Sequence, residues 1–189
     1  MKNEIKVLQK IIARKGPSKT LTFSIPHILK AIQLLSKEKF VSRSNFCNEL
    51  FLGEGAVKTL IRRLKEENLA DTTKAGTYLT PNGKKIAGFF EKTIPYEYHI
   101  QSSKTVTKKH NHAILLRGYA NSIKTGIEQR DYAILYGSEG CLTLLYKNEN
   151  FIFPSDDKEA LYDDVKTKRL IKKNLHPKEG DVIIISSSS

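Results

Sequence analysis

Apolar residues recur at intervals of three and four in the first part of the chain, the spacing of a helix that buries one face. Over residues 1–16 this pattern predicts a short basic helix that ends at the Gly-Pro pair of positions 16–17. Its apolar face consists of Ile5, Leu8, Ile11 and Ile12. This face either packs on the domain that follows or serves as a dimerisation element.

Two further helices are expected between residues 24 and 52. Ser24 can cap the first, and either Ser42 or Ser44 can cap the second, because a serine hydroxyl accepts from the free amides of a helix start. The inward positions are Ile28, Leu29, Ile32 and Leu35 in the first helix and Phe46, Leu50 and Leu52 in the second. Gly53 then ends the second helix.

A third helix, over residues 54–67, carries the most specific pattern. Its buried stripe consists of Val57, Leu60, Ile61 and Leu64. At about 100° per residue, the side chains that point away from this stripe are Gly55, Thr59, Arg62 and Glu66, with Lys58 and Arg63 on the flanks. Small residues at the start and long donors one turn later suit a helix that enters the DNA major groove.

Two short strands around a tight turn are expected over residues 69–80, because Thr and Tyr favour strands and a Lys-Ala-Gly tip occupies positions 74–76. Thr80 and Pro81 then start a helix as its cap and its first residue. That helix turns Lys84 and Lys85 outward.

The order helix, helix, helix, hairpin, helix over residues 24–93 resembles that of the winged helix-turn-helix transcriptional regulators. The segments RRLKEENLA at 62–70 and YLTPNGKKI at 78–86 are similar to the end of that family's recognition helix and the close of its wing. The resemblance implies a DNA-binding domain over residues 24–95, with helix 54–67 in the major groove and the wing, 69–80, on the flanking backbone. We expect the DNA-contacting residues to be Arg43, Ser44, Gly55, Lys58, Thr59, Arg62, Arg63, Lys74, Lys84 and Lys85.

The charge of the chain is unevenly distributed. The sequence holds 32 Lys and Arg against 20 Asp and Glu, a formal net charge of +12. Residues 1–95 contain 18 basic and 8 acidic residues, a balance of +10, whereas residues 96–189 contain 14 and 12, a balance of +2. A general preference for lysine would raise both halves alike, so the field that attracts a polyanion belongs to the first half.

The second half has a different pattern. Residues 96–112 lack a helical period and are expected to form a linker with one extended strand. Residues 113–189 then predict a strand, a helix from Asn121 to Gly137, a hairpin through 148–150, a helix over 156–174 and a final strand. This β-α-β-β-α-β order is that of the ferredoxin-like unit. The expected fold is therefore α+β, with a basic helix and loop at 1–23, the winged helix, and a small α/β sandwich domain at 113–189 for dimerisation or effector sensing.

Candidate chemistry is sparse. No nucleophile-base pair or P-loop is visible, and His110 and His112 lack a further ligand nearby. Cys47 and Cys141 are far apart and are interpreted as buried thiols in a reducing compartment. Acidic pairs at 156–157 and 163–164 suggest a divalent metal, but the first pair is explained by the dipole of a helix start. We therefore expect no catalytic residues, metal or cofactor, and no enzymatic activity.

The segment GIEQRD, 126–131, is the most polar stretch of the predicted helix. Glu128, Arg130 and Asp131 form either its solvated face, or a polar pocket lining or subunit contact in which Arg130 meets a carboxylate or phosphate. No signal peptide or membrane-spanning run is visible, which indicates a cytoplasmic protein.

A winged helix joined to a small α/β domain resembles the one-component prokaryotic regulators, including those related to leucine-responsive proteins, in which a ferredoxin-like domain dimerises and binds small effectors. More narrowly, GEGAVKTLIRRL together with GIEQRDYAI is similar to a little-characterised archaeal family of winged-helix regulators. These resemblances imply a sequence-specific regulator of transcription that binds double-stranded DNA as a homodimer, with a small-molecule effector as a further partner.

Two other classes of function remain open at this stage. The first is a winged-helix scaffold that binds RNA or protein, which the +10 half would also suit. The second is an enzyme that uses the winged helix only for targeting.

Overall fold

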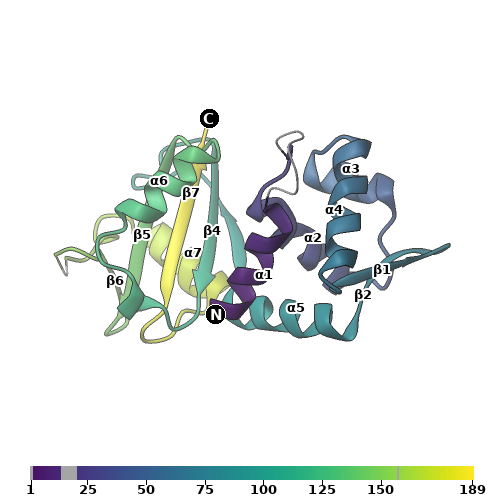
Figure 1. Ribbon diagram of the computed structural model, residues 1–189. Helices are drawn as coiled ribbons and strands as arrows, with labels where there is room; N and C mark the ends of the chain where they lie inside the picture. The colour runs from purple at the N-terminus through teal and green to yellow at the C-terminus, as the bar shows by residue number, and fades with distance from the viewer. Residues whose placement is uncertain (1, 14–20, 157) are drawn as a thin grey trace. The chain divides into compact units, whose positions relative to one another are not determined.

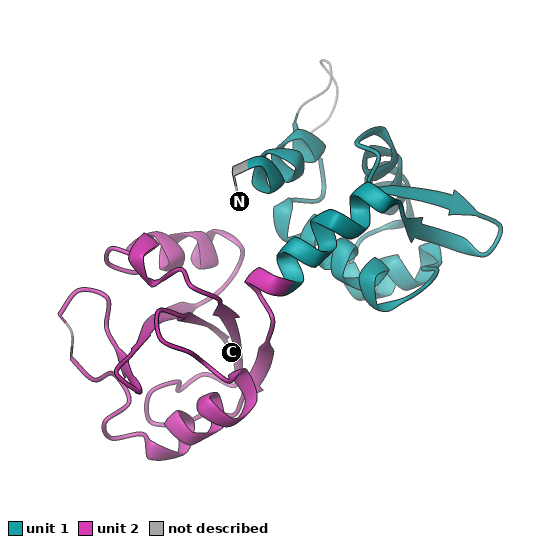
Figure 2. Cartoon of the chain, turned by 90° about the horizontal axis from the view of Figure 1, so that it is seen from below, with its two compact units in different colours: residues 1–91 teal, residues 92–189 magenta. Residues whose placement is uncertain are grey.

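The alternation of helical and strand patterns produces a mixed α+β fold. The computed structural model describes residues 2–13, 21–156 and 158–189, and these residues form seven α-helices and two antiparallel sheets. The chain divides into two compact units, unit 1 (Met1–Glu91) and unit 2 (Lys92–Ser189) (Figure 2). The expected end of the first helix at positions 16–17 lies outside the described residues.

Unit 1 consists mainly of helices, with one hairpin (Figure 1). Its elements are α1 (Lys2–Ile12), α2 (Ile25–Lys37), α3 (Arg43–Leu50), α4 (Glu54–Glu66), β1 (Ala70–Thr73), β2 (Gly76–Leu79) and α5 (Pro81–Thr93), whose last two residues belong to unit 2. The order and approximate bounds match the pattern of apolar positions, so local periodicity determines this half of the fold.

The helices α2 and α3 begin at the expected residues. Ser42, rather than Ser44, caps α3, and its hydroxyl accepts from the amide of Asn45 at 3.1 Å. At the start of α2, the amide of Ser24 donates to Nδ1 of His27 at 3.2 Å. Partial burial lowers the pKa of His27, which keeps this nitrogen available as an acceptor.

Helix α1 packs within unit 1. Leu8 and Ile11 are each only 1% exposed and belong to the same core as Phe46, Leu60 and Leu64. The apolar face of α1 is therefore buried inside its own chain, which favours packing over dimerisation as the role of this helix.

The hairpin of unit 1 is tied to the helices on two sides. Val41, which precedes α3, exchanges two backbone hydrogen bonds of 2.9 Å with Thr77 of β2. At the start of α5, a Cβ added to Gly83 would lie 1.9 Å from the carbonyl oxygen of Leu69. Only glycine permits this close approach, which fixes α5 against the base of the hairpin.

Unit 2 is built on a five-stranded antiparallel sheet with the order β3-β4-β7-β5-β6 (Figure 1). Its strands are β3 (Glu97–Ile100), β4 (His110–Leu116), β5 (Gly140–Lys147), β6 (Asn150–Ile152) and β7 (Val182–Ser188). The segment 96–112 contributes β3 to the edge of this sheet and the first residues of β4. The ferredoxin-like order is not confirmed, because the last strand, β7, pairs with both β4 and β5.

The core of unit 2 lies on one face of the sheet. Successive side chains of a strand alternate between faces, and Leu115, Leu144 and Ile183 occupy the same face at paired positions. Helix α7 (Val165–Leu175) buries Ile171 and Leu175 against them. The two helices of unit 2 lie on either side of the sheet (Figure 2).

Both helices of unit 2 begin later than expected. Helix α6 (Ile127–Leu135) starts after Gly126, whose φ of +80° interrupts any helix from Asn121; the latter lies in a short 3₁₀ helix, η1 (Ala120–Ser122). Before α7, the amide of Ala160 donates to the carbonyl of Phe151 at 2.8 Å, so this stretch pairs with β6.

The cap of α7 is Asp164, whose carboxylate accepts from the amide of Thr167 at 3.2 Å. The acidic pair at the start of α7 is thus 163–164; of the pair expected there, 156–157, Asp156 lies before the helix and residue 157 lies outside the described residues. Burial alone raises the pKa of Asp164, but hydrogen bonds from Ser103 and from the amides of Thr167 and Thr105 outweigh it and lower this pKa to about 2.

Candidate nucleic-acid interface

Helix α4 divides its side chains as the sequence predicts. The stripe of Val57, Leu60, Ile61 and Leu64 is buried in the core of unit 1. On the other side Arg62 exposes 67% of its side chain, and its Nε lies 3.9 Å from Oε1 of Glu66. Lys58 is also exposed. The helix therefore presents two cationic side chains on a solvent-facing surface.

The first turn of α4 is open to a close approach. Gly55 is exposed, and a Cβ added there would have no neighbour within 4 Å. Thr59 is half-buried, and its hydroxyl donates to the carbonyl of Gly55 at 3.0 Å. Because this hydroxyl is already bonded within the helix, Thr59 contributes shape at this surface more than a free donor.

Arg63 corrects the sequence-based assignment, because it is buried. Its side chain is 6% exposed, and Nη1 donates to the carbonyls of Ile11 at 2.6 Å and Ala13 at 2.7 Å. Arg63 and Lys58 lie on opposite flanks of the buried stripe, each about 110° from its centre. Helix α1 covers the flank of Arg63 and leaves that of Lys58 free, so Arg63 holds the end of α1 and takes no part in an exposed surface.

Helix α3 adds polar groups at its start. Arg43 and Ser44 are exposed in the first turn of α3. The hydroxyl of Ser44 lies 2.9 Å from that of the capping residue Ser42. A polar helix start with an exposed cation favours an anionic partner.

The hairpin and α5 carry the remaining expected cations. Lys74 is exposed in the turn between β1 and β2, and Lys84 and Lys85 are exposed in the first turns of α5. Lys65 was not predicted from the sequence to have a role. Its Nζ donates a hydrogen bond to Oδ1 of Asp71 at 2.8 Å, which anchors the hairpin to α4. This hydrogen bond lowers the pKa of Asp71.

A groove beside the hairpin was not foreseen. Its volume is about 420 Å³, and it is lined by Leu35, Ser36, Lys37, Glu38, Lys39, Phe40, Thr73, Tyr78, Leu79 and Lys84. The rings of Phe40 and Tyr78 meet edge to face at 5.8 Å, and Nζ of Lys39 lies 5.7 Å from the centre of the Phe40 ring. No periodic pattern in residues 36–40 signals this groove, because it forms only when the hairpin packs beside the end of α2.

In unit 2 the three charged residues of α6 lie on its surface. Glu128, Arg130 and Asp131 are all exposed, and Nη2 of Arg130 lies 3.1 Å from Oδ1 of Asp131. The groove described above involves none of them. Of the alternatives from the sequence, this exposure is compatible with a solvated face or a subunit contact.

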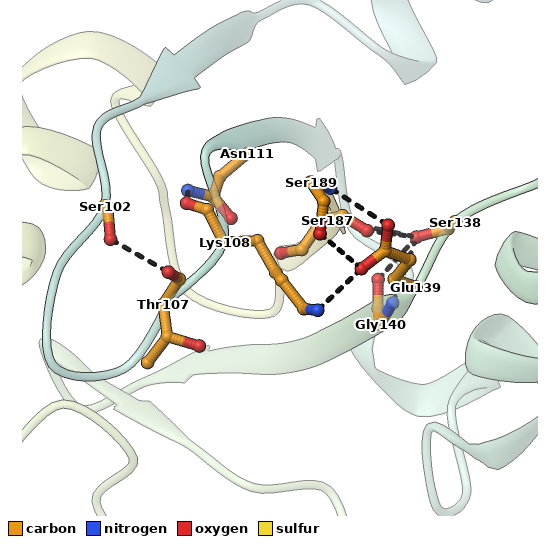
Figure 3. A network of polar contacts seen from close by, with 9 residues as sticks. All are labelled: Ser102, Thr107, Lys108, Asn111, Ser138, Glu139, Gly140, Ser187 and Ser189. Atoms are coloured by element: carbon orange, nitrogen blue, oxygen red, sulfur yellow. Dashed lines mark hydrogen bonds and ion pairs between the residues drawn. The ribbon is translucent and has the colours of Figure 1, made fainter.

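A polar network joins the strand ends of unit 2 (Figure 3). Nζ of Lys108 lies 2.6 Å from Oε2 of Glu139, and the amide of Ser189 donates to Oε1 of Glu139 at 3.1 Å. Beside it, Oγ of Ser138 lies 2.6 Å from the carbonyl of Gly140. The Lys108 hydrogen bond, followed by those from Ser189, lowers the pKa of Glu139 to about 2. These groups satisfy one another, so the network fastens β5 and β7 together.

The histidines and cysteines do not form a metal centre. Nε2 of His112 lies 3.4 Å from Oε2 of Glu97, and its ring packs against that of His99. Within the described ranges, no group of three or more His, Cys, Asp or Glu residues could hold a metal ion. Cys47 and Cys141 are free thiols and only half-buried, and burial raises the pKa of Cys141.

None of the helices in the described part of the chain has both the length and the apolar character needed to cross a membrane.

Comparisons with known proteins relate the chain to a family model and to solved structures. Residues 107–189 match the family model described as a domain of unknown function (DUF4443). Among solved structures, the hypothetical protein PH0730 from Pyrococcus horikoshii OT3 is similar, with 26% sequence identity, a TM-score of 0.66, and coverage of 88% of this chain and 83% of that chain. No curated protein matches. Both matches fit the expected resemblance to a little-characterised archaeal family.

Proposed function

We propose that this chain is a sequence-specific, DNA-binding regulator of transcription, in which α2, α3, α4, the β1-β2 hairpin and α5 act as a winged helix-turn-helix domain. Helix α4 enters the major groove, and the hairpin contacts the flanking backbone. The observation that carries this proposal is the outer face of α4. It combines an unobstructed first turn at Gly55 with the exposed cations Lys58 and Arg62.

The distribution of charge supports the same partner. The balance of +10 over residues 1–95 belongs largely to the unit that contains α4, whereas residues 96–189 have a balance of +2. Exposed cations on α3, the hairpin and α5 extend the surface beyond α4, at Arg43, Lys74 and Lys85. Several phosphate contacts at once give DNA binding its strength and its dependence on salt.

Arg62→Ala tests the major-groove contact. If Arg62 reads a guanine, its loss weakens binding by about 1–3 kcal/mol and relaxes the preference at one base pair. Arg169→Ala is the matched control, because Arg169 is an exposed arginine on helix α7 of unit 2. The measurement is fluorescence anisotropy with a duplex recovered by selecting bound fragments from genomic DNA. Equal affinities of the two variants would remove Arg62 from the interface.

The hairpin and α5 make a second prediction. Lys74→Ala and Lys84→Ala weaken binding to all DNA sequences alike. Each also reduces the slope of log affinity against log salt concentration by about one. Titration at four or more salt concentrations measures that slope. An unchanged slope in both variants would contradict wing contacts to the backbone.

A scaffold that binds RNA is the second candidate, because the same +10 balance attracts any polyanion. Competition among the selected duplex, single-stranded RNA and folded RNA separates the two. If selection enriches no DNA sequence and RNA competes better than duplex DNA, the regulator proposal is wrong and the scaffold replaces it.

The proposed regulator acts as a homodimer, because one winged helix reads too few base pairs to discriminate among the sites of a genome. A two-fold axis then places two half-sites about 34–36 Å apart, or at a multiple of that distance. Unit 2 supplies the dimer contact and is the place for a small-molecule effector in this proposal. Selected fragments with repeated, inverted half-sites would support the dimer.

A further inference from the structure

Helix α6 turns its apolar residues away from its own chain. Along α6 no side chain is buried, and the two that face the sheet most closely, Gln129 and Ala133, are polar or small. Four large apolar side chains point outward instead: Ile127 and Ile134 are each 50% exposed, Tyr132 66% and Leu135 73%. The side chains that an ordinary amphipathic helix would bury are thus exposed to solvent in α6.

These exposed side chains form one continuous face. Ile127, Asp131 and Leu135 are spaced by four residues, so they line up along one stripe of the helix. Tyr132 and Ile134, the latter 50% exposed, flank this stripe. Single exposed apolar residues are common, but a contiguous apolar face with charged residues within it marks an interaction surface.

We propose that the outer face of α6 is the surface through which two copies of this chain associate, around a two-fold axis near Asp131. Ile127 and Leu135 lie four residues on either side of Asp131. An axis at that point therefore brings Ile127 of each copy onto Leu135 of the other. A surface that is complementary to itself in this way forms a closed, symmetric pair.

The charges on α6 suit a second copy of the chain. Asp131 is already paired with Arg130 at 3.1 Å, so the charges of the two aspartates that meet at the axis are balanced by the two arginines. Each Arg130 then lies between two carboxylates. The acidic residues Glu128 and Asp131 oppose binding to DNA or to an anionic membrane through this helix.

The balance of charge over the chain selects the same region. If two copies met through residues 1–95, a net charge of +10 would face another of +10 and the copies would repel each other. Residues 96–189 have a net charge of only +2, so a contact through them meets much less repulsion. A face of nine residues is about 13 Å long, so we expect a contact between two such helices to bury less than the roughly 800 Å² per partner of a standard interface. The association therefore depends on concentration in the micromolar range.

Sedimentation velocity on the full chain, without DNA, tests the proposal. Between about 1 and 200 µM, the parent chain passes from monomer to dimer. Leu135→Asp weakens association more than about tenfold, as expected for removing an apolar anchor. Val165→Asp is the matched control, because Val165 is 70% exposed in the same unit but lies on α7. It associates as the parent does.

A charge exchange tests the two-fold arrangement independently of apolar packing. Arg130→Glu makes the face acidic and Asp131→Arg makes it basic, so each variant alone associates more weakly than the parent. An equimolar mixture of the two associates more strongly than either one. Circular dichroism checks that all variants remain folded.

Three results would overturn the proposal: a parent chain that stays monomeric over the whole range, a Leu135→Asp variant as dimeric as Val165→Asp, or a mixture no stronger than its components. Because DNA is absent from these measurements, their failure leaves the role of α4 open. A failure to bind DNA likewise leaves this self-association intact.

Discussion

Two adjacent arginines of α4 are expected to have opposite effects when they are replaced. Arg62 is exposed, whereas Arg63 is buried against the end of α1. We predict that Arg63→Ala destabilises unit 1, and that Arg62→Ala leaves its stability within about 0.5 kcal/mol.

The magnitude for Arg63 follows from its contacts. Nη1 donates to the carbonyls of Ile11 and Ala13, which lie at the end of α1, where carbonyls lack partners within the helix. A hydrogen bond to a charged group contributes about 1.5–3 kcal/mol, and the cation also opposes the helix dipole. No described acceptor meets Nε of Arg63, which offsets part of this gain. We therefore expect a loss of about 3 kcal/mol.

Scanning calorimetry of the full chain measures this loss. For a unit of this size, about 3 kcal/mol lowers the unfolding midpoint by roughly 12–24 °C. Hydrogen exchange gives the location, because the amides of α1 lose protection first when its end is released. Arg63→Met keeps most of the side-chain volume but loses the hydrogen bonds. Comparing it with Arg63→Ala therefore separates the contribution of packing from that of the hydrogen bonds. An Arg63→Ala chain with parental stability and parental exchange in α1 would refute the assignment.

Three further substitutions test the packing of each unit. Leu60→Ala removes a fully buried side chain and costs about 2–5 kcal/mol in urea unfolding. Gly83→Ala drives a Cβ into the carbonyl of Leu69 and destabilises unit 1 by about 1–3 kcal/mol, measured in the same way. Asp164→Ala removes the cap of α7 and costs about 1–2 kcal/mol at pH 7. Since the pKa of Asp164 is lowered to about 2 from 3.8, its contribution is complete above about pH 4 and disappears as the pH falls through 2. The parent and Asp164→Ala chains should therefore converge in stability in acid.

Local pattern predicted the helices of unit 1 and the division of α4. The buried stripe of α4 depends only on the angle between successive residues, so Leu60 and Leu64 could be assigned from spacing alone. The place of Arg63 could not be assigned in this way. Arg63 and Lys58 are equivalent on the helix, and only the packing of α1 on one flank distinguishes them.

Unit 2 was less predictable because its form depends on contacts between distant segments. The stretch before α7 has a helical composition, yet Ala160 pairs with Phe151 of β6. Strand order is set by which strands pair, and the sequence of β7 is equally compatible with an edge and a central position. The groove at Phe40 and Tyr78 likewise requires two segments that only the fold brings together.

Helix α6 illustrates why the same pattern can support opposite interpretations. Its sequence, IEQRDYAIL, places four polar residues before four largely apolar ones and contains no clean stripe, so spacing alone does not show which side faces the sheet. In the structure a Cβ added to Gly126 would lie 3.0 Å from Cβ of Thr143, so the start of the helix lies close against β5 and turns its small side toward the sheet. The apolar residues are then left outside, each half or more exposed. Helix α6 thus packs on its own sheet through its small side, and its apolar side is available for the proposed association with a second copy of the chain. The proposed DNA contacts and the proposed self-association therefore involve different units, so substitutions that test one need not affect the other.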